Sequence, residues 1–96
     1  MEDYLVEASI LLDKARGLSA EERKVLVYFV ENISVGSIRA VKELRQLGVS
    51  NPQVVVRKLV AMGLLEEGED CFNLSKPLRE YLARRGKASV LKELHA

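Results

Sequence analysis

Between Leu47 and Pro52 the sequence stops one helix and starts another, and this feature constrains the fold more than any other. Gly48 follows an apolar helical pattern and supplies the left-handed conformation in which many helices end, because glycine has no Cβ to clash. Asn51 is a good N-cap, and proline at the first helical position removes only an amide that a helix leaves without a partner. Two helices joined by so short a connection must cross sharply, so the segment predicts a helix-turn-helix.

Apolar residues at three- and four-residue spacing define the faces of these two helices. The first helix is expected to begin with Ser37 as its cap. Its predicted inward face consists of Ile38, Val41, Leu44 and Leu47. The second helix is expected to run from Pro52 to Met62. Its predicted inward residues are Val55, Val56, Leu59, Val60 and Met62, and its predicted outward residues are Gln53, Val54, Arg57, Lys58 and Ala61.

A short hairpin is predicted directly after the second helix. Two leucines, an acidic turn that contains Gly68, and residues 71–74 read as strand, turn and strand. Residues 34–37 break the helical pattern and predict either a short strand or a turn. Ser75 is expected to cap a further helix that ends at Gly86. A helix-turn-helix followed by such a hairpin is a winged helix-turn-helix.

Amphipathic segments flank this motif. Residues 3–16 place apolar side chains on one helical face, and Ser19 with Glu22 forms a capping box at the start of a strongly apolar helix. The tail over residues 87–96 has helical spacing but is too short to be stable alone, so it must lie against something. We therefore predict one mainly α domain with a small β-hairpin. Its expected parts are an N-terminal flanking helix in 1–17, a core of about 19–85 and the tail helix in 87–96.

Composition limits the function classes. Of 96 residues, 48% are apolar and 30% are charged, with a net charge of +1, as in a folded domain. The longest purely apolar run, from Val25 to Val30, is too short to span a membrane, and the lone Cys71 has no partner for a disulfide or a metal site. No residue pattern indicates catalysis, a cofactor or a bound metal. We expect a cytoplasmic protein that is not an enzyme.

The order of elements resembles known winged helix-turn-helix families. The residues that carry the resemblance are Lys42-Glu43-Leu44, Gly48-Val49-Ser50 and Leu59 through Gly63-Leu64-Leu65. Over about residues 19–85 the chain is similar to archaeal and bacterial regulators of the ArsR and MarR kind. The resemblance implies that the 52–62 helix enters the major groove of DNA.

Local charge agrees with a DNA-binding role. Residues 34–65 contain five bases against Glu43, a net charge of +4, although the whole chain is nearly neutral. The leading hypothesis is therefore a DNA-binding transcriptional regulator or chromosome-associated factor. The residues expected to contact duplex DNA are Arg39, Ser50, Asn51, Gln53, Val54, Arg57 and Lys58.

The wing favours a different function. Wings that bind DNA usually carry lysine or arginine, whereas this one carries four carboxylates, which a phosphate backbone would repel. Those residues are Glu66, Glu67, Glu69 and Asp70. An outward-pointing Val54 also makes the second helix partly apolar, as a protein contact would be. The alternative hypothesis is a protein-interaction module, a small accessory subunit of a replication, transcription or repair complex that uses the acidic wing or the Val54 surface.

A homodimer is also expected. The flanking segments carry apolar faces outside the winged-helix motif, and DNA-binding versions of this fold usually pair through such helices. The expected dimer contacts are Leu5, Ala8, Leu11, Leu12, Val90, Leu91 and Leu94.

Overall fold

A computed structural model describes residues 3–95, so residues 1–2 and 96, at the ends of the predicted flanking segments, lie outside the described part. The helices are α1 (Asp3–Ala15), α2 (Ala20–Asn32), α3 (Ser37–Gln46), α4 (Pro52–Ala61), α5 (Lys76–Arg85) and α6 (Lys87–Leu94). The strands are β1 (Ser34–Gly36), β2 (Leu65–Gly68) and β3 (Cys71–Leu74). The fold is mainly helical with a small antiparallel sheet, as the sequence predicts. None of the described helices is long and apolar enough to cross a membrane.

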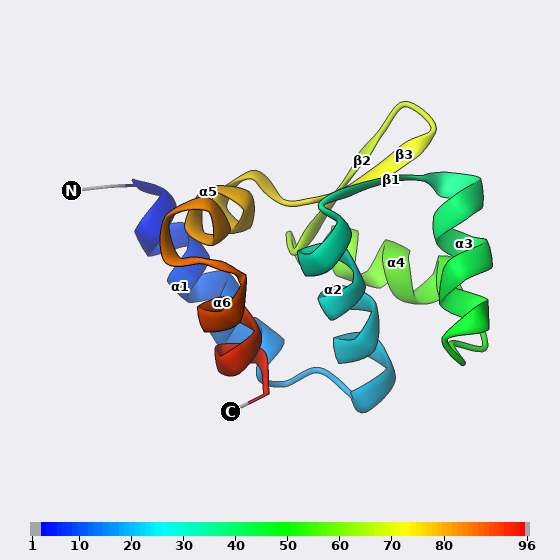
Figure 1. The fold of residues 1–96 in the computed structure, drawn as a ribbon, viewed down its shortest axis with the longest axis horizontal. Coiled ribbons are helices and arrows are strands. Elements are labelled where there is room, and N and C mark those ends of the chain that lie inside the picture. The colour runs from blue at the N-terminus through cyan, green and yellow to red at the C-terminus, as the bar shows by residue number, and fades with distance from the viewer. Residues whose placement is uncertain (1–2, 96) are drawn as a thin grey trace.

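Helix α2 lies at the centre of the core. Its start is fixed by the predicted capping box, in which the Glu22 amide donates to Ser19 Oγ at 3.1 Å and the Ser19 amide donates to Glu22 Oε1 at 2.9 Å. Figure 1 shows α6 on one side of α2 and α4 on the other, and both pack against it. The most deeply buried side chains of α2 are Val25, Leu26, Phe29 and Val30.

Both helices of the helix-turn-helix end at a glycine in a left-handed conformation. Gly48 has a φ of 96° and Gly63 a φ of 82°, conformations that favour glycine. After each glycine the chain turns back: the Val49 amide donates to the Leu44 carbonyl at 3.0 Å, and the Leu64 amide donates to the Leu59 carbonyl at 3.0 Å. The predicted stops are therefore confirmed.

The predicted hairpin is part of a larger sheet. Strand β3 lies in the middle, in the order β1-β3-β2, and both neighbours run antiparallel to it. Phe72 pairs with Val35 on one side and with Glu67 on the other. The segment left open as strand or turn is thus strand β1, which joins the end of α2 to α3 across the base of the wing.

Helix α3 does not face inward as predicted. Its buried residues are Ala40 and Leu44, whereas Ile38 is 87% exposed and Leu47 is also exposed. The small Ala40, one turn before Leu44, lets α3 approach the core closely, and this rotates the larger Ile38 out to solvent. Ser37 is also the first residue of α3 rather than its cap, because Gly36 occupies the N-cap position.

The flanking helices cover the core of their own chain. Figure 1 shows α1, α5 and α6 grouped together beside α2, and α1 packs against both α5 and α6. Several residues expected at a dimer interface are buried in this group, namely Ala8, Leu11, Leu12, Val90 and Leu94, and Leu5 and Leu91 are half-buried against it. Most of these side chains are thus used within the chain, and the homodimer stays a prediction.

Two valines of α4 test the assignment of its inward face. We expect Val56→Ala to lower the free energy of unfolding by about 1.5–3 kcal/mol, because burial of this side chain is lost and a cavity remains. Val54→Ala, in the same helix, should change it by less than about 0.5 kcal/mol, because removing an exposed side chain leaves no cavity. Val56 is fully buried and Val54 is 63% exposed. Denaturant unfolding measures both, and equal losses would contradict the assignment.

Candidate functional site

The structure brings three of the predicted contact residues, Gln53, Val54 and Arg57, onto one surface with two residues of α3. Ile38 and Val41 of α3 and Gln53, Val54 and Arg57 of α4 form what we call the α3–α4 face. All except Val54 line a shallow groove of about 330 Å³. Val54 is exposed beside it, between Gln53 and Val55 on α4. The groove also reaches the wing, through Phe72 and Glu67. Ser50 and Asn51 are exposed at the start of α4.

The bases of α4 are paired with carboxylates from other elements. Lys58 Nζ lies 2.5 Å from Glu22 Oε2 of α2, and Arg57 Nη1 lies 3.7 Å from Glu67 Oε1 of β2. The hydrogen bond from Lys58, followed by that from the Ser19 amide, lowers the pKa of the Glu22 carboxyl. Within the described residues, α4 has no other base. Each base on its outer surface therefore has a carboxylate nearby, although the side chains of Arg57 and Lys58 stay largely exposed.

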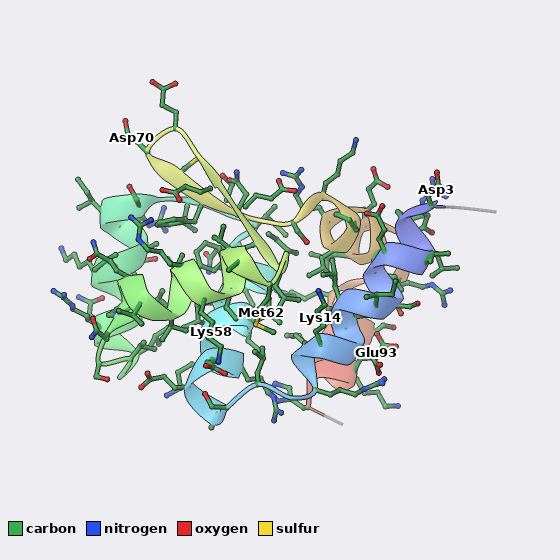
Figure 2. The ribbon with its side chains drawn as sticks, turned by 180° about the vertical axis from the view of Figure 1, so that it is seen from behind. Asp3, Lys14, Lys58, Met62, Asp70 and Glu93 are labelled. Atoms are coloured by element: carbon green, nitrogen blue, oxygen red, sulfur yellow. The ribbon has the colours of Figure 1, made fainter. Side chains whose placement is uncertain are left out.

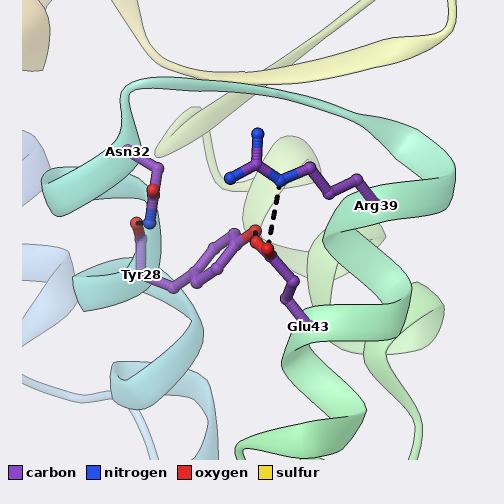
Figure 3. A network of polar contacts seen from close by, with 4 residues as sticks. All are labelled: Tyr28, Asn32, Arg39 and Glu43. Carbon is purple, nitrogen blue, oxygen red and sulfur yellow. Dashed lines mark hydrogen bonds and ion pairs between the residues drawn. The ribbon is translucent and has the colours of Figure 1, made fainter.

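Arg39 on α3 is held in a similar way (Figure 3). Its Nε lies 3.0 Å from Glu43 Oε2, and the Tyr28 hydroxyl donates a short hydrogen bond to the same carboxylate. Asn32 Nδ2 donates to the Tyr28 carbonyl at 2.8 Å, one turn further along α2. The hydrogen bonds from Tyr28 and then Arg39 lower the pKa of Glu43. This cluster joins α2 to α3 and neutralises a third predicted base.

Other bases of α3 remain unpaired. Lys42 and Arg45 are exposed and form no direct ion pair with any residue in 3–95. Of the five bases that the sequence places in residues 34–65, only these two have no carboxylate partner among residues 3–95. The apolar character of the α3–α4 face comes from Ile38 and Val54, which are exposed on neighbouring helices. Two large exposed apolar side chains beside one groove are typical of a protein contact.

The four acids of the wing divide into two pairs. Glu66 accepts a hydrogen bond from the Lys76 amide at 2.9 Å and lies 3.6 Å from Arg79, so it caps α5. Glu67 pairs with Arg57, as described above. Glu69 and Asp70 are exposed at the tip of the hairpin, which Figure 2 shows projecting from the body of the molecule at Asp70. Half of the acidic wing thus holds neighbouring elements in place.

Comparison with known proteins identifies the family. Residues 19–80 match the family described as PolB1 Binding Protein 2. This match covers more than half of the chain, and the chain belongs to that family. None of the curated proteins matches the sequence.

The family corrects two of the predictions from sequence. The resemblance to ArsR and MarR regulators is wrong as an assignment of family, because the caps and glycines that carry it determine a winged-helix fold and not what the fold binds. The predicted role in DNA binding and transcription regulation is contradicted with it. The family is named for binding a protein, which supports the alternative hypothesis of a protein-interaction module.

Sequence reasoning missed the part played by Ile38. It counted this residue with the inward face because Ile38, Val41 and Leu44 share helical spacing. The signal that could have located the true face is Ala40, four residues before Leu44, because small residues occur where helices pack closely. The pairing of Lys58 with Glu22 has no sequence signal, since the two residues lie far apart in the chain.

The hydrogen bond between Tyr28 and Glu43 can be tested by titration. Burial, then the neighbouring Glu43 carboxylate, raises the pKa of Tyr28 from 10.0 to about 12. The folded protein thus keeps this proton at a pH where the unfolded chain loses it, so this stabilising effect is full below pH 10 and is lost as the pH rises toward 12. Burial also raises the pKa of Tyr81, so absorbance of the phenolate should show a late ionisation of Tyr28 that is missing in Tyr28→Phe while that of Tyr81 remains. In Glu43→Gln, Tyr28 should ionise earlier, and an unchanged titration would contradict the contact.

Proposed function

We propose that this member of the PolB1 Binding Protein 2 family is a small accessory protein that binds the DNA polymerase PolB1. Its role is to dock, with no chemistry of its own. The family's name supplies the partner. The observation that carries the proposal is the α3–α4 face, where Ile38 and Val54 are exposed and both bases of α4 have carboxylate partners.

The charges of the α3–α4 face favour a protein partner over a phosphate backbone. Affinity for a duplex comes chiefly from lysine and arginine that are free to replace its counterions. Here Arg39, Arg57 and Lys58 each have a carboxylate partner within the protein. A duplex would therefore have to break these pairs or accept carboxylates near its phosphates. A protein surface can accept the pairs as they stand.

The apolar groups of the face can supply binding energy. Central, well-buried apolar and arginine side chains dominate the affinity of most protein interfaces. Ile38 and Arg57 line the groove, Arg57 pairs there with Glu67, and Val54 is exposed next to Gln53 on α4. The proposed binding mode places apolar side chains of PolB1 between α3 and α4, with Arg57 available for hydrogen bonds at the edge.

The tip of the wing is the second candidate contact. Only Glu69 and Asp70 remain for it, since Glu66 and Glu67 are engaged with Arg79 and Arg57. Two exposed carboxylates on a hairpin tip offer little apolar surface and their attraction is screened by salt. We therefore place the main contact on the α3–α4 face and not on the tip.

A charge placed on the face tests the proposal. Val54→Glu should weaken binding to purified PolB1 by roughly thirtyfold or more, because a carboxylate would be buried against apolar groups. The matched control is Ala88→Glu, which adds the same charge to an exposed helical position on α6. Calorimetry with the full chain measures both dissociation constants, and denaturant unfolding checks that stability is unchanged. Equal affinity for Val54→Glu and wild type would refute docking through this face.

A further inference from the structure

A second groove shares Glu67 with the groove of the α3–α4 face. It has a volume of about 650 Å³ and runs between α1, the C-terminal end of α4, β2 and the start of α5. We call it the α1–α4 groove. Figure 2 shows Lys14 of α1 beside Met62, whose carbonyl accepts a hydrogen bond from Lys14 Nζ at 3.4 Å. The apolar side chains that line the groove are those of Ile10, Leu11, Val60, Met62, Leu65 and Pro77.

The α1–α4 groove contains a buried hydroxyl without a partner. Ser75 lines it and is only 2% exposed, and its Oγ makes no hydrogen bond to any described residue. Ser75 stands at the N-cap of α5 but does not cap it. An N-cap serine usually accepts from the amide two or three residues on; here Pro77 has no amide hydrogen, and the Leu78 amide makes no hydrogen bond with Ser75 Oγ. Buried hydroxyls are nearly always hydrogen-bonded, and this Oγ has almost no accessible surface, so a bound segment can supply the bond only when the Ser75 side chain turns toward the groove.

The rim of the groove is acidic. Glu7, Glu66 and Glu67 surround it, against Lys14 alone. Glu66 and Glu67 have ion-pair partners, but no residue in 3–95 pairs with Glu7. One helical turn away Ile10 is 55% exposed, so an apolar group and a free carboxylate lie side by side on α1. This combination is complementary to an apolar segment that carries a lysine or arginine.

The two grooves meet at Glu67, which lines both. The Arg57–Glu67 pair between them is exposed on both sides and is therefore weak and easily displaced. From Gln53 to Met62 the path along α4 is about 14 Å, a distance that one bound segment can cover. A stable interface buries about 800 Å² on each partner, which Ile38 and Val54 alone do not supply. Because the α1–α4 groove adjoins the α3–α4 face at Glu67, both can belong to one interface.

We infer that the α1–α4 groove is a second contact site for PolB1. It binds a segment of the polymerase that places apolar side chains against Ile10 and Met62, a lysine or arginine against Glu7, and a polar group against Ser75 Oγ. The inference rests on the proposed function, because it takes PolB1 as the partner. It goes further in assigning the chemistry of the bound segment and a role for the buried hydroxyl.

The decisive variant is Ser75→Ala. Loss of one hydrogen bond in the complex should weaken binding to PolB1 about fivefold. The free protein should be no less stable, because a hydroxyl without a partner is removed. Ser89→Ala, at an exposed position of α6, is the matched control and should change neither quantity. If Ser75→Ala lowered the midpoint of thermal unfolding, the hydroxyl would be capping α5 in the free protein, and the inference would be overturned.

Charge reversal tests the rim independently. Glu7→Lys should weaken binding to PolB1 about tenfold at low salt, and the difference should shrink as salt is added. Glu31→Lys makes the same change at an exposed position of α2 outside both grooves and should leave the affinity unchanged. If Val54→Glu abolished binding while Glu7→Lys and Ser75→Ala left it intact, the groove would not be a contact and the proposed function would stand. If the wild-type protein failed to bind PolB1, the proposed function itself would fall.

Discussion

The burial of the broad apolar face of α2 is the constraint on which the rest of the structure depends. Helix α4 and the sheet pack on one side of it, and α6 packs on the other. The winged-helix elements by themselves cover only one side of this face, whose buried residues are Val25, Leu26, Tyr28, Phe29 and Val30. The flanking helices supply the other side. Their apolar faces are buried against the core. The surfaces left for a partner are therefore on α3, on α4 and on the outer face of α1.

The α3–α4 face owes its character to carboxylates that reach it from other elements. Glu22 comes from the start of α2, Glu43 from α3 and Glu67 from the wing. Ion pairs as exposed as these contribute little to stability. Their larger effect is on what the face can bind, because three bases that would otherwise be free for phosphate are neutralised. A helix-turn-helix that keeps its geometry but has three of its bases paired with carboxylates presents a partly apolar ridge on α4, suited to a protein surface.

Local chemistry accounts for the parts of the fold that the sequence predicts well. Capping pairs and glycine stops act within a few residues, so the start of α2, the end of α3 and both ends of α4 follow from the chain alone. The error on α3 has a different origin. Ile38 was assigned to the wrong face of α3 because helical spacing does not say which of two overlapping apolar faces packs against the core. Spacing likewise does not say that the apolar faces of α1 and α6 pack within their own chain.

The sequence by itself determined the order of helices and strands, the sharp turn at Gly48, the hairpin and the exposure of Val54, since each depends on short-range geometry. It also indicated the conflict between a basic helix and an acidic wing. Only the tertiary structure decided how that conflict is resolved, because it brings Glu67 to Arg57 and Glu22 to Lys58 across the chain. Only the tertiary structure shows that Ser75 lines the α1–α4 groove with no hydrogen-bond partner for its hydroxyl among the described residues. Whether a buried hydroxyl is hydrogen-bonded depends on every element that surrounds it.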